Sequence, residues 1–208
     1  MNNMTPDPVR IAVLVSGGGT NLQALLDAEK SGVLHSGHIS LVVSNSAKAY
    51  ALERAALSGV PAVTLLKKAL GGQEAFENAL EAALEKYRIG LIVLAGFLNI
   101  LSPGFTERYD HRIINIHPSL IPSFCGEGFY GLRVHEAALE RGVKVTGATV
   151  HYVNGIPDGG EIIMQKAVPV MPRDTPETLQ KRVMRRAEWV LLPRAAEYVC
   201  ELLLGARK

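Results

Sequence analysis

Short apolar runs alternate with amphipathic segments through the first half of the chain. The apolar runs have the length and composition of buried strands, and they cover residues 11–15, 39–44, 60–65, 91–95 and 112–117. Between them, the pattern of residues 48–58 and 73–87 is that of helices. Alternating strands and helices are typical of proteins with a parallel sheet, so the sequence predicts an α/β fold.

The regular alternation stops near the middle of the chain. Residues 123–131 hold three glycines and three aromatic residues without any period, which predicts a mobile loop. A helix is expected over residues 132–141, ending at a glycine. The last helix is predicted to begin at a cap formed by Asp174 or Thr175 and to run to the C-terminus, with a kink at Pro193.

Two further strands are predicted in the C-terminal half, at residues 144–153 and 161–170. The connection between them, residues 154–160, is too short for a crossover helix. We therefore expect these strands to pair antiparallel, which makes the sheet mixed. No stretch has the character of a linker, so residues 1–208 are expected to form a single domain.

One predicted strand carries polar side chains at its end: residues 112–122 read R-I-I-N-I-H-P-S-L-I-P. The isoleucines favour a strand, and Pro118 ends it. Asn115 and His117 are two residues apart, so their side chains point to the same face. Together they could donate hydrogen bonds to a developing oxyanion and move a proton. The alternative is that His117 is a core histidine and Asn115 a strand-end cap.

A carboxylate is predicted to approach the same strand end. Asp158 lies in the turn N-G-I-P-D-G-G at residues 154–160, and it could reach His117 if the sheet is mixed as predicted. A carboxylate beside an imidazole raises the pKa of the ring and fixes its orientation. The alternative is ordinary turn chemistry, because Pro-Asp-Gly favours turns by itself. His151, on the preceding strand, is expected to face the core.

A glycine-rich turn, S-G-G-G-T-N at residues 16–21, joins the first strand to the following helix. Glycines let backbone N–H groups approach an anion, and a helix N-terminus favours negative charge. A dinucleotide fingerprint is excluded, because Leu22 stands at its third glycine position and no acid follows the second strand. We expect one phosphate at Gly19, Thr20 and Asn21, with a ligand-free turn as the alternative.

The composition weighs against several classes of function. Charged residues make up 20% of the chain and the net charge is +2, which gives no reason to expect nucleic-acid binding. No apolar run has the length of a membrane span, and the first residues lack the pattern of a signal peptide, so none is expected. Two cysteines without a paired motif indicate the reducing cytoplasm. His35 and His38 have no clear third ligand, so no metal site is expected.

Taken together, the motifs resemble the phosphoribosylglycinamide formyltransferase family, folate-dependent enzymes of purine synthesis, over nearly the whole chain. The matching segments are S-G-G-G-T-N-L-Q at 16–23, V-L-A-G-F at 93–97, I-L-S-P at 100–103, N-I-H-P-S-L at 115–120 and D-G-G at 158–160. Each motif alone is weak, whereas their order and spacing are specific. The resemblance implies a Rossmann-like formyltransferase fold with a mostly parallel central sheet and an antiparallel C-terminal strand pair.

The resemblance also implies a reaction, in which the amine of glycinamide ribonucleotide attacks the formyl carbon of 10-formyltetrahydrofolate. Asn115 and protonated His117 would stabilise the oxyanion, while Asp158 would keep His117 charged and relay a proton to the leaving nitrogen. The residues implied to contact glycinamide ribonucleotide are Gly19, Thr20, Asn21 and Glu188. Those implied to line the folate pocket are Leu98, Asn99, Ile100, Leu101, Asn115, Asn154, Gly155, Ile156, Pro157 and Asp158. No metal is implied.

The chain departs from the family pattern at three places. The loop of residues 123–134 is longer than in many relatives and could act as a lid. Gln73 stands where many relatives carry a basic residue near the folate tail. The segment before Glu188 is one residue longer.

Three rival functions share parts of this pattern. Methionyl-tRNA formyltransferase has a further C-terminal domain and formyltetrahydrofolate hydrolase an extra N-terminal one, and we expect 208 residues to leave room for neither. The rival from another class is a non-catalytic, nucleotide-sensing Rossmann module that would use only the glycine-rich turn. We expect a monomer or homodimer that acts on small molecules.

Overall fold

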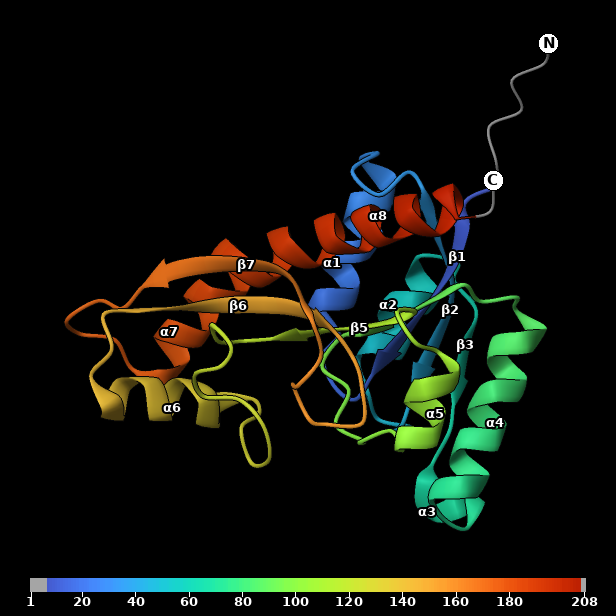
Figure 1. The fold of residues 1–208 in the computed structure, drawn as a ribbon, viewed down its shortest axis with the longest axis horizontal. Coiled ribbons are helices and arrows are strands. Elements are labelled where there is room, and N and C mark those ends of the chain that lie inside the picture. Colours follow the sequence, from blue (N-terminus) through green and yellow to red (C-terminus); the bar gives the residue numbers. More distant parts are fainter. Residues whose placement is uncertain (1–6, 207–208) are drawn as a thin grey trace.

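The computed structural model describes residues 7–206, which form one seven-stranded sheet with helices on both faces (Figure 1). The strand order is β3-β2-β1-β4-β5-β6-β7. The strands are β1 (Val9–Val15), β2 (Gly37–Ser44), β3 (Ala62–Thr64), β4 (Leu91–Leu94), β5 (Ile113–His117), β6 (Val145–Tyr152) and β7 (Ile162–Pro169). The predicted α/β fold class is confirmed.

The first five strands pair in parallel, as the alternating pattern predicted. The helices between them are α1 (Thr20–Lys30), α2 (Ala51–Leu57), α3 (Lys67–Leu70) and α4 (Gln73–Lys86). The edge strand β3 is shorter than expected, and the single turn α3 was not predicted.

The C-terminal strands make the sheet mixed. β6 pairs antiparallel with β7, which confirms the predicted pair, and it also pairs antiparallel with β5. In the β5–β6 register, Asn115 is opposite His151, and His117 is opposite Thr149. β5 therefore pairs with the carboxyl-terminal half of β6, and it lies between the parallel and the antiparallel parts of the sheet.

The later helices are α5 (Pro103–Arg108), α6 (Leu132–Arg141), α7 (Pro176–Val183) and α8 (Trp189–Gly205). The Oγ atom of Ser102 caps α5, and Thr175, one of the two caps predicted for the last helix, is the cap of α7. The predicted last helix is helical from Pro176 to Gly205, but it contains a π-helical turn, η1 (Met184–Glu188), that was not predicted and that divides it into α7 and α8. A π-helical turn holds one residue more than an α-helical turn. The expectation that the segment before Glu188 is one residue longer than in the family stays a prediction.

Each face of the sheet covers its own apolar core. Along β1, Ile11 and Val13 point into one core while Ala12 and Leu14 point into the other, and all four are completely buried. The first core is closed by α1, α2 and α8, and the second by α4 and α5 (Figure 1). This arrangement leaves the strand ends uncovered by helices. No helix within residues 7–206 is long and apolar enough to cross a membrane.

Candidate active site

The candidate site lies at the carboxyl end of β5, which is where open α/β sheets place their ligands. Asn115 and His117 project from the same face of this strand, as their spacing predicted. Asp158 comes from the turn between β6 and β7. The Nδ1 atom of His117 is 3.3 Å from Oδ2 of Asp158, and Nδ2 of Asn115 is 3.4 Å from Oδ1. The predicted approach of the three side chains is confirmed.

The backbone at Asp158 is held in the left-handed region, with φ of 54°. Such a conformation is unusual for a residue other than glycine, and it clusters at functional sites. The next residues explain how the turn is fixed, because Gly160 lies directly against the carbonyl oxygen of Tyr152. The turn is thus packed tightly onto β6, and it aims the carboxylate of Asp158 at β5.

His151 also faces this cluster, so the expectation that it points into the core is wrong. Its Nε2 atom is 3.1 Å from Nδ2 of Asn115 and 3.5 Å from Oδ1 of Asp158. Its Nδ1 atom is 2.7 Å from the carbonyl oxygen of Tyr152, an arrangement that suits a proton on Nδ1. Nε2 can then accept from Asn115, which orients the amide.

The long loop after β5 contacts the cluster through its backbone. The Nε2 atom of His117 lies 2.8 Å from the carbonyl oxygen of Phe124, and the N–H of Gly126 donates to Oδ2 of Asp158 at 2.9 Å. Phe124 has a left-handed backbone, with φ of 51°. Since neither contact involves a loop side chain, residue types alone gave no sign of them. The prediction that this loop is mobile stays a prediction.

The protonation of His117 reflects opposing influences. Burial lowers the pKa of the imidazole, whereas the charge of Asp158 and the carbonyl of Phe124 raise it, and burial prevails. The simple expectation of a raised pKa is therefore wrong. Burial also opposes ionisation of Asp158, but the charge of His117 and the hydrogen bond from the N–H of Gly126 lower the pKa of the carboxyl below its usual value. Because both nitrogens of His117 face oxygen acceptors, only the protonated ring donates to both.

His135, on α6, was not among the predicted site residues. The side chain is 1% exposed, and neither ring nitrogen has a hydrogen-bond partner among the described residues. Burial, and to a smaller extent the charge of His117, lower the pKa of His135 to about 4. A neutral ring therefore lies beside the catalytic candidates. Its helical spacing with Val134 and Ala138 resembles an ordinary core position, which hid it.

The glycine-rich turn forms a second part of the site. Gly19 precedes α1 with a left-handed backbone, φ of 70°, and a Cβ atom there would lie 2.6 Å from Cβ of Ala51. Asn21 and Glu188 are both buried, and Nδ2 of Asn21 donates to Oε2 of Glu188 at 2.7 Å. Burial raises the pKa of Glu188. The structure thus brings together residues 167 positions apart that the resemblance assigned to one ligand.

The two predicted folate segments also lie next to each other. A Cβ atom on Gly155 would contact Pro103 at 3.2 Å, so the turn after β6 lies against the start of α5. Apolar side chains beside this contact are solvent-exposed: Leu98 by 62%, Ile100 by 67% and Ile156 by 65%. These exposed side chains could form the walls of a pocket for a flat apolar ring.

Leu101 and Asn99 depart from that picture. The side chain of Leu101 is 5% exposed and belongs to the core under α4 and α5, so it does not face a pocket. The Oδ1 atom of Asn99 accepts a hydrogen bond from Nδ2 of Asn45 at 2.9 Å. Its side chain ties this segment to the end of β2.

A buried carboxylate anchors the same segment from α4. Oε1 of Glu77 accepts from the N–H of Ser102 at 2.6 Å, and Oε2 accepts from its hydroxyl at 2.6 Å. Burial opposes ionisation of Glu77, but the hydrogen bonds from Ser102 lower its pKa. Gln73 donates to the carbonyl of Ile100 at 3.1 Å, so this side chain helps to hold the segment.

The sequence prediction that His35 lacks further ligands needs correction. Ligand atoms of His35, Glu197 and Glu201 lie within 4.8 Å of one another. The Oε2 atom of Glu197 accepts the backbone N–H groups of His35 and Ser36, both at 2.9 Å, while Oε1 lies 3.0 Å from Nδ1 of His35. Through these contacts Glu197 holds α8 to the segment before β2, which explains why the three side chains lie together.

Known proteins are similar to this chain in sequence and fold. The model of the formyl transferase family matches residues 9–195 of the chain. The chain belongs to the formyl transferase family. It is 40% identical to a phosphoribosylglycinamide formyltransferase from Haemophilus influenzae, over 92% of the chain and 87% of that protein. It is 41% identical to the enzyme of the same name from Escherichia coli, over 84% of the chain and 80% of that protein.

Longer proteins and solved structures extend the comparison. A trifunctional purine biosynthetic protein from Bos taurus is 42% identical over 95% of the chain, which spans 19% of that protein. Glycinamide ribonucleotide transformylase 1 from Symbiobacterium toebii has a TM-score of 0.87 at 42% identity, covering 93% and 88% of the two chains. A formyltetrahydrofolate deformylase from Pseudomonas syringae has a TM-score of 0.83 at 28% identity, covering 94% of this chain and 62% of its own. The fold is thus shared by transferases and a deformylase.

Proposed function

We propose that this chain transfers the formyl group of 10-formyltetrahydrofolate to the amine of glycinamide ribonucleotide. The convergence of Asn115, His117 and Asp158 on one strand end carries the proposal, because this trio can stabilise a tetrahedral intermediate and move its protons. The similarity to enzymes named phosphoribosylglycinamide formyltransferase over most of the chain supports this choice of reaction.

In the proposed mechanism, the substrate amine attacks the formyl carbon and the carbonyl electrons move onto oxygen. The amide of Asn115 and the protonated ring of His117 donate hydrogen bonds to that oxyanion. Asp158, whose carboxyl has a lowered pKa, remains ionised and stabilises the charged ring. As the intermediate collapses, the nitrogen of the folate leaves with a proton that comes from the attacking amine through this cluster.

His151 has a positioning role in this scheme. Because Nε2 of His151 can accept one N–H of Asn115, the second N–H keeps a fixed direction. That N–H lies toward Oδ1 of Asp158, with a nitrogen–oxygen distance of 3.4 Å, and in the proposed scheme it leaves this long contact for the oxyanion. The loop carbonyl of Phe124 occupies Nε2 of His117 in the structure. We propose that this contact opens when the formyl group enters, which frees Nε2–H for the oxyanion.

The substrates are proposed to approach from two sides. The phosphate of glycinamide ribonucleotide would lie at the N–H groups of Gly19, Thr20 and Asn21, with Glu188 near the glycinamide. The pterin would lie between the exposed side chains of Leu98 and Ile100 and the turn of residues 154–158. The described chain would act as one domain, because a single continuous sheet carries both halves of the site.

The test is an assay of the purified chain with 10-formyltetrahydrofolate, with and without glycinamide ribonucleotide. Formation of tetrahydrofolate only in the presence of the acceptor is expected. A phosphate-free glycinamide riboside is the matched acceptor, and we expect it to react poorly because it lacks the group that the glycine-rich turn would bind. Conversion without any acceptor would point to a deformylase, and absence of conversion with tight dinucleotide binding to a sensing module.

A further inference from the structure

Helix α2 supports the glycine-rich turn from behind. The backbone N–H of Ala51, in its first turn, donates to the carbonyl oxygen of Gly17 at 3.1 Å. One turn later, Nε of Arg54 donates to the carbonyl oxygen of Gly18 at 2.8 Å. The carbonyl of Gly19 accepts from the N–H of Gln23 inside α1, at 2.9 Å. Three consecutive carbonyls of the turn are therefore engaged by donors.

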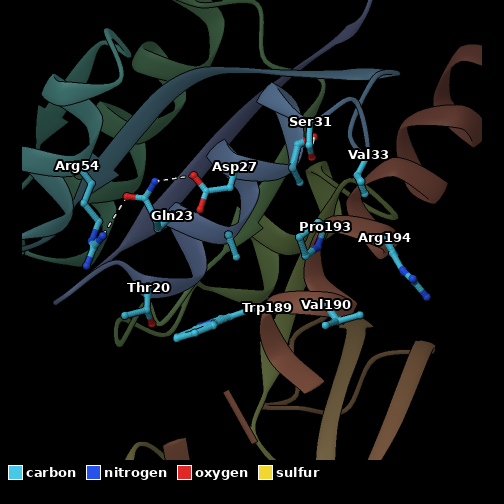
Figure 2. A pocket seen from close by; sticks show the side chains of 12 residues that line it. Thr20, Gln23, Asp27, Ser31, Val33, Arg54, Trp189, Val190, Pro193 and Arg194 are labelled. Atoms are coloured by element: carbon cyan, nitrogen blue, oxygen red, sulfur yellow. Dashed lines mark hydrogen bonds between the residues drawn. The ribbon is translucent and has the colours of Figure 1, made fainter. Parts of the chain in front are cut away.

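The guanidinium of Arg54 is itself held in place by further contacts. Its Nη1 atom donates to Oε1 of Gln23 at 2.9 Å, and Gln23 in turn donates to Oδ1 of Asp27 at 2.9 Å (Figure 2). The guanidinium carbon lies 5.0 Å from the centre of the Tyr50 ring, a cation–π distance. Figure 2 shows the side chains of Arg54, Gln23 and Asp27, linked by these hydrogen bonds, along one wall of a groove of about 570 Å³ between α1 and α8.

Carbonyl dipoles decide whether such a turn can hold an anion. A carbonyl oxygen that points toward a phosphate repels it, whereas an N–H group attracts it. When a donor fixes the carbonyls of Gly17 and Gly18 on the α2 side, the peptide N–H groups on the opposite edges of the turn are left for a ligand. A fork-shaped guanidinium can bond Gly18 and Gln23 at once, and it also adds a positive charge near the site.

We propose that Arg54 is a positioning residue for the phosphate of the acceptor substrate: it fixes the glycine-rich turn in its anion-binding shape without touching the reacting atoms. This inference rests on the proposed function, since it concerns how that site recognises glycinamide ribonucleotide. It assigns a role to a side chain outside every motif in the sequence.

The test compares Arg54→Met with Arg54→Lys in steady-state kinetics, varying each substrate in turn. Arg54→Met removes both donors, and we expect KM for glycinamide ribonucleotide to rise about tenfold or more while KM for 10-formyltetrahydrofolate and kcat change less than about threefold. Arg54→Lys keeps the charge but cannot bond two acceptors as a fork, so its KM should be intermediate. Arg194→Met, on the opposite wall of the groove, removes the same charge and should leave both KM values unchanged.

The outcomes separate the two proposals. A wild-type chain that turns over, with Arg54→Met at wild-type KM, overturns the role of Arg54 and leaves the proposed function standing. Equal KM values for Arg54→Lys and wild type would reduce Arg54 to a simple charge and overturn positioning. A wild-type chain without acceptor-dependent turnover overturns both. If Arg54→Met fails to fold in a thermal melt, Arg54→Lys and Gln23→Ala decide, the second with an expected KM increase of about threefold.

Discussion

The parallel and antiparallel parts of the sheet carry different kinds of chemistry. On the parallel side, the glycine-rich turn offers backbone N–H groups at the start of a helix, beside the buried side chains of Asn21 and Glu188. On the antiparallel side, His117, His151 and Asp158 are packed together with the half-buried amide of Asn115 and a left-handed turn. The first arrangement suits binding of a charged group, while the second suits proton movement. We therefore expect substitutions in the two parts to affect different kinetic constants.

The largest effect is expected at β5. Asn115→Ala or His117→Ala removes one donor to the oxyanion, which typically costs about 100- to 1000-fold in rate. We expect kcat to fall by that amount while the thermal unfolding profile stays close to that of wild type. Near-normal kcat in either purified variant would contradict the assignment of the trio and with it the contrast between the two parts.

The next effect concerns stability at two glycines, one in each part. Gly160→Ala would drive a methyl group into the carbonyl of Tyr152 on β6, so we expect a loss of about 3 kcal/mol or more in the free energy of unfolding. Gly19→Ala would place a side chain on a left-handed backbone and bring its methyl group against Ala51. We expect a loss of about 1–2 kcal/mol in the free energy of unfolding. Urea unfolding measures both.

Gly104→Ala is the control for these glycine variants, because a methyl group at that helical position meets no atom within 4 Å. It should be neutral or slightly stabilising. A smaller loss of unfolding free energy for Gly160→Ala than for Gly19→Ala would contradict this prediction. It would mean that the turn before β7 adapts to an added methyl group more easily than the glycine-rich turn does.

A pH-dependent effect is expected from His135. Its pKa of about 4 in the folded state lies below the ordinary value of 6.5, so the unfolded chain binds more protons between these values. Stability should therefore rise with pH across this window, and this group alone should cost about 2 kcal/mol at pH 5 relative to pH 8. His135→Leu should lose that dependence. Comparing urea midpoints of variant and wild type at both pH values isolates the effect, and parallel pH profiles would disprove it.

The smallest effect is expected in the parallel part. Asn21→Ala removes the side chain that joins the glycine-rich turn to Glu188, and we expect KM for glycinamide ribonucleotide to rise about tenfold. Because the side chain of Asn21 bonds Glu188 and none of Asn115, His117 and Asp158, kcat should fall much less than in Asn115→Ala. A fall in kcat of equal size would show that the two parts do not work separately. Steady-state kinetics with glycinamide ribonucleotide as the varied substrate measures both constants.

The sequence predicted those features that depend on local pattern. Alternating strands and helices indicated the sheet, and the spacing of Asn115 and His117 indicated a shared face. The short connection around Asp158 indicated an antiparallel pair and thus the approach of the carboxylate. These inferences need only strand period and loop length, which neighbouring residues set.

The features that could not be predicted depend on contacts between distant segments. The carbonyl of Phe124 and the N–H of Gly126 are backbone groups that every residue carries, so no residue type marks them. Glu77 resembles a solvent-facing position on an amphipathic helix until Ser102 is seen beside it. The pKa of His117 could not be predicted for a similar reason, since burial depends on how the whole loop packs over the ring.

The π-helical turn η1 has a consequence for how the C-terminal segment tolerates changes in length. Each residue of an α-helix turns the chain by about 100°, so an inserted residue would swing the apolar stripe of α8 away from its seat on the sheet. The wider turn at Met184–Glu188 takes up one residue more than an α-helical turn, and Leu192 and Ala195 beyond it are buried. The π-helical turn therefore absorbs one residue without changing how α7 and α8 pack on either side of it. Glu188 lies within this turn, so the direction of its carboxyl group depends on the geometry of the π-helical turn.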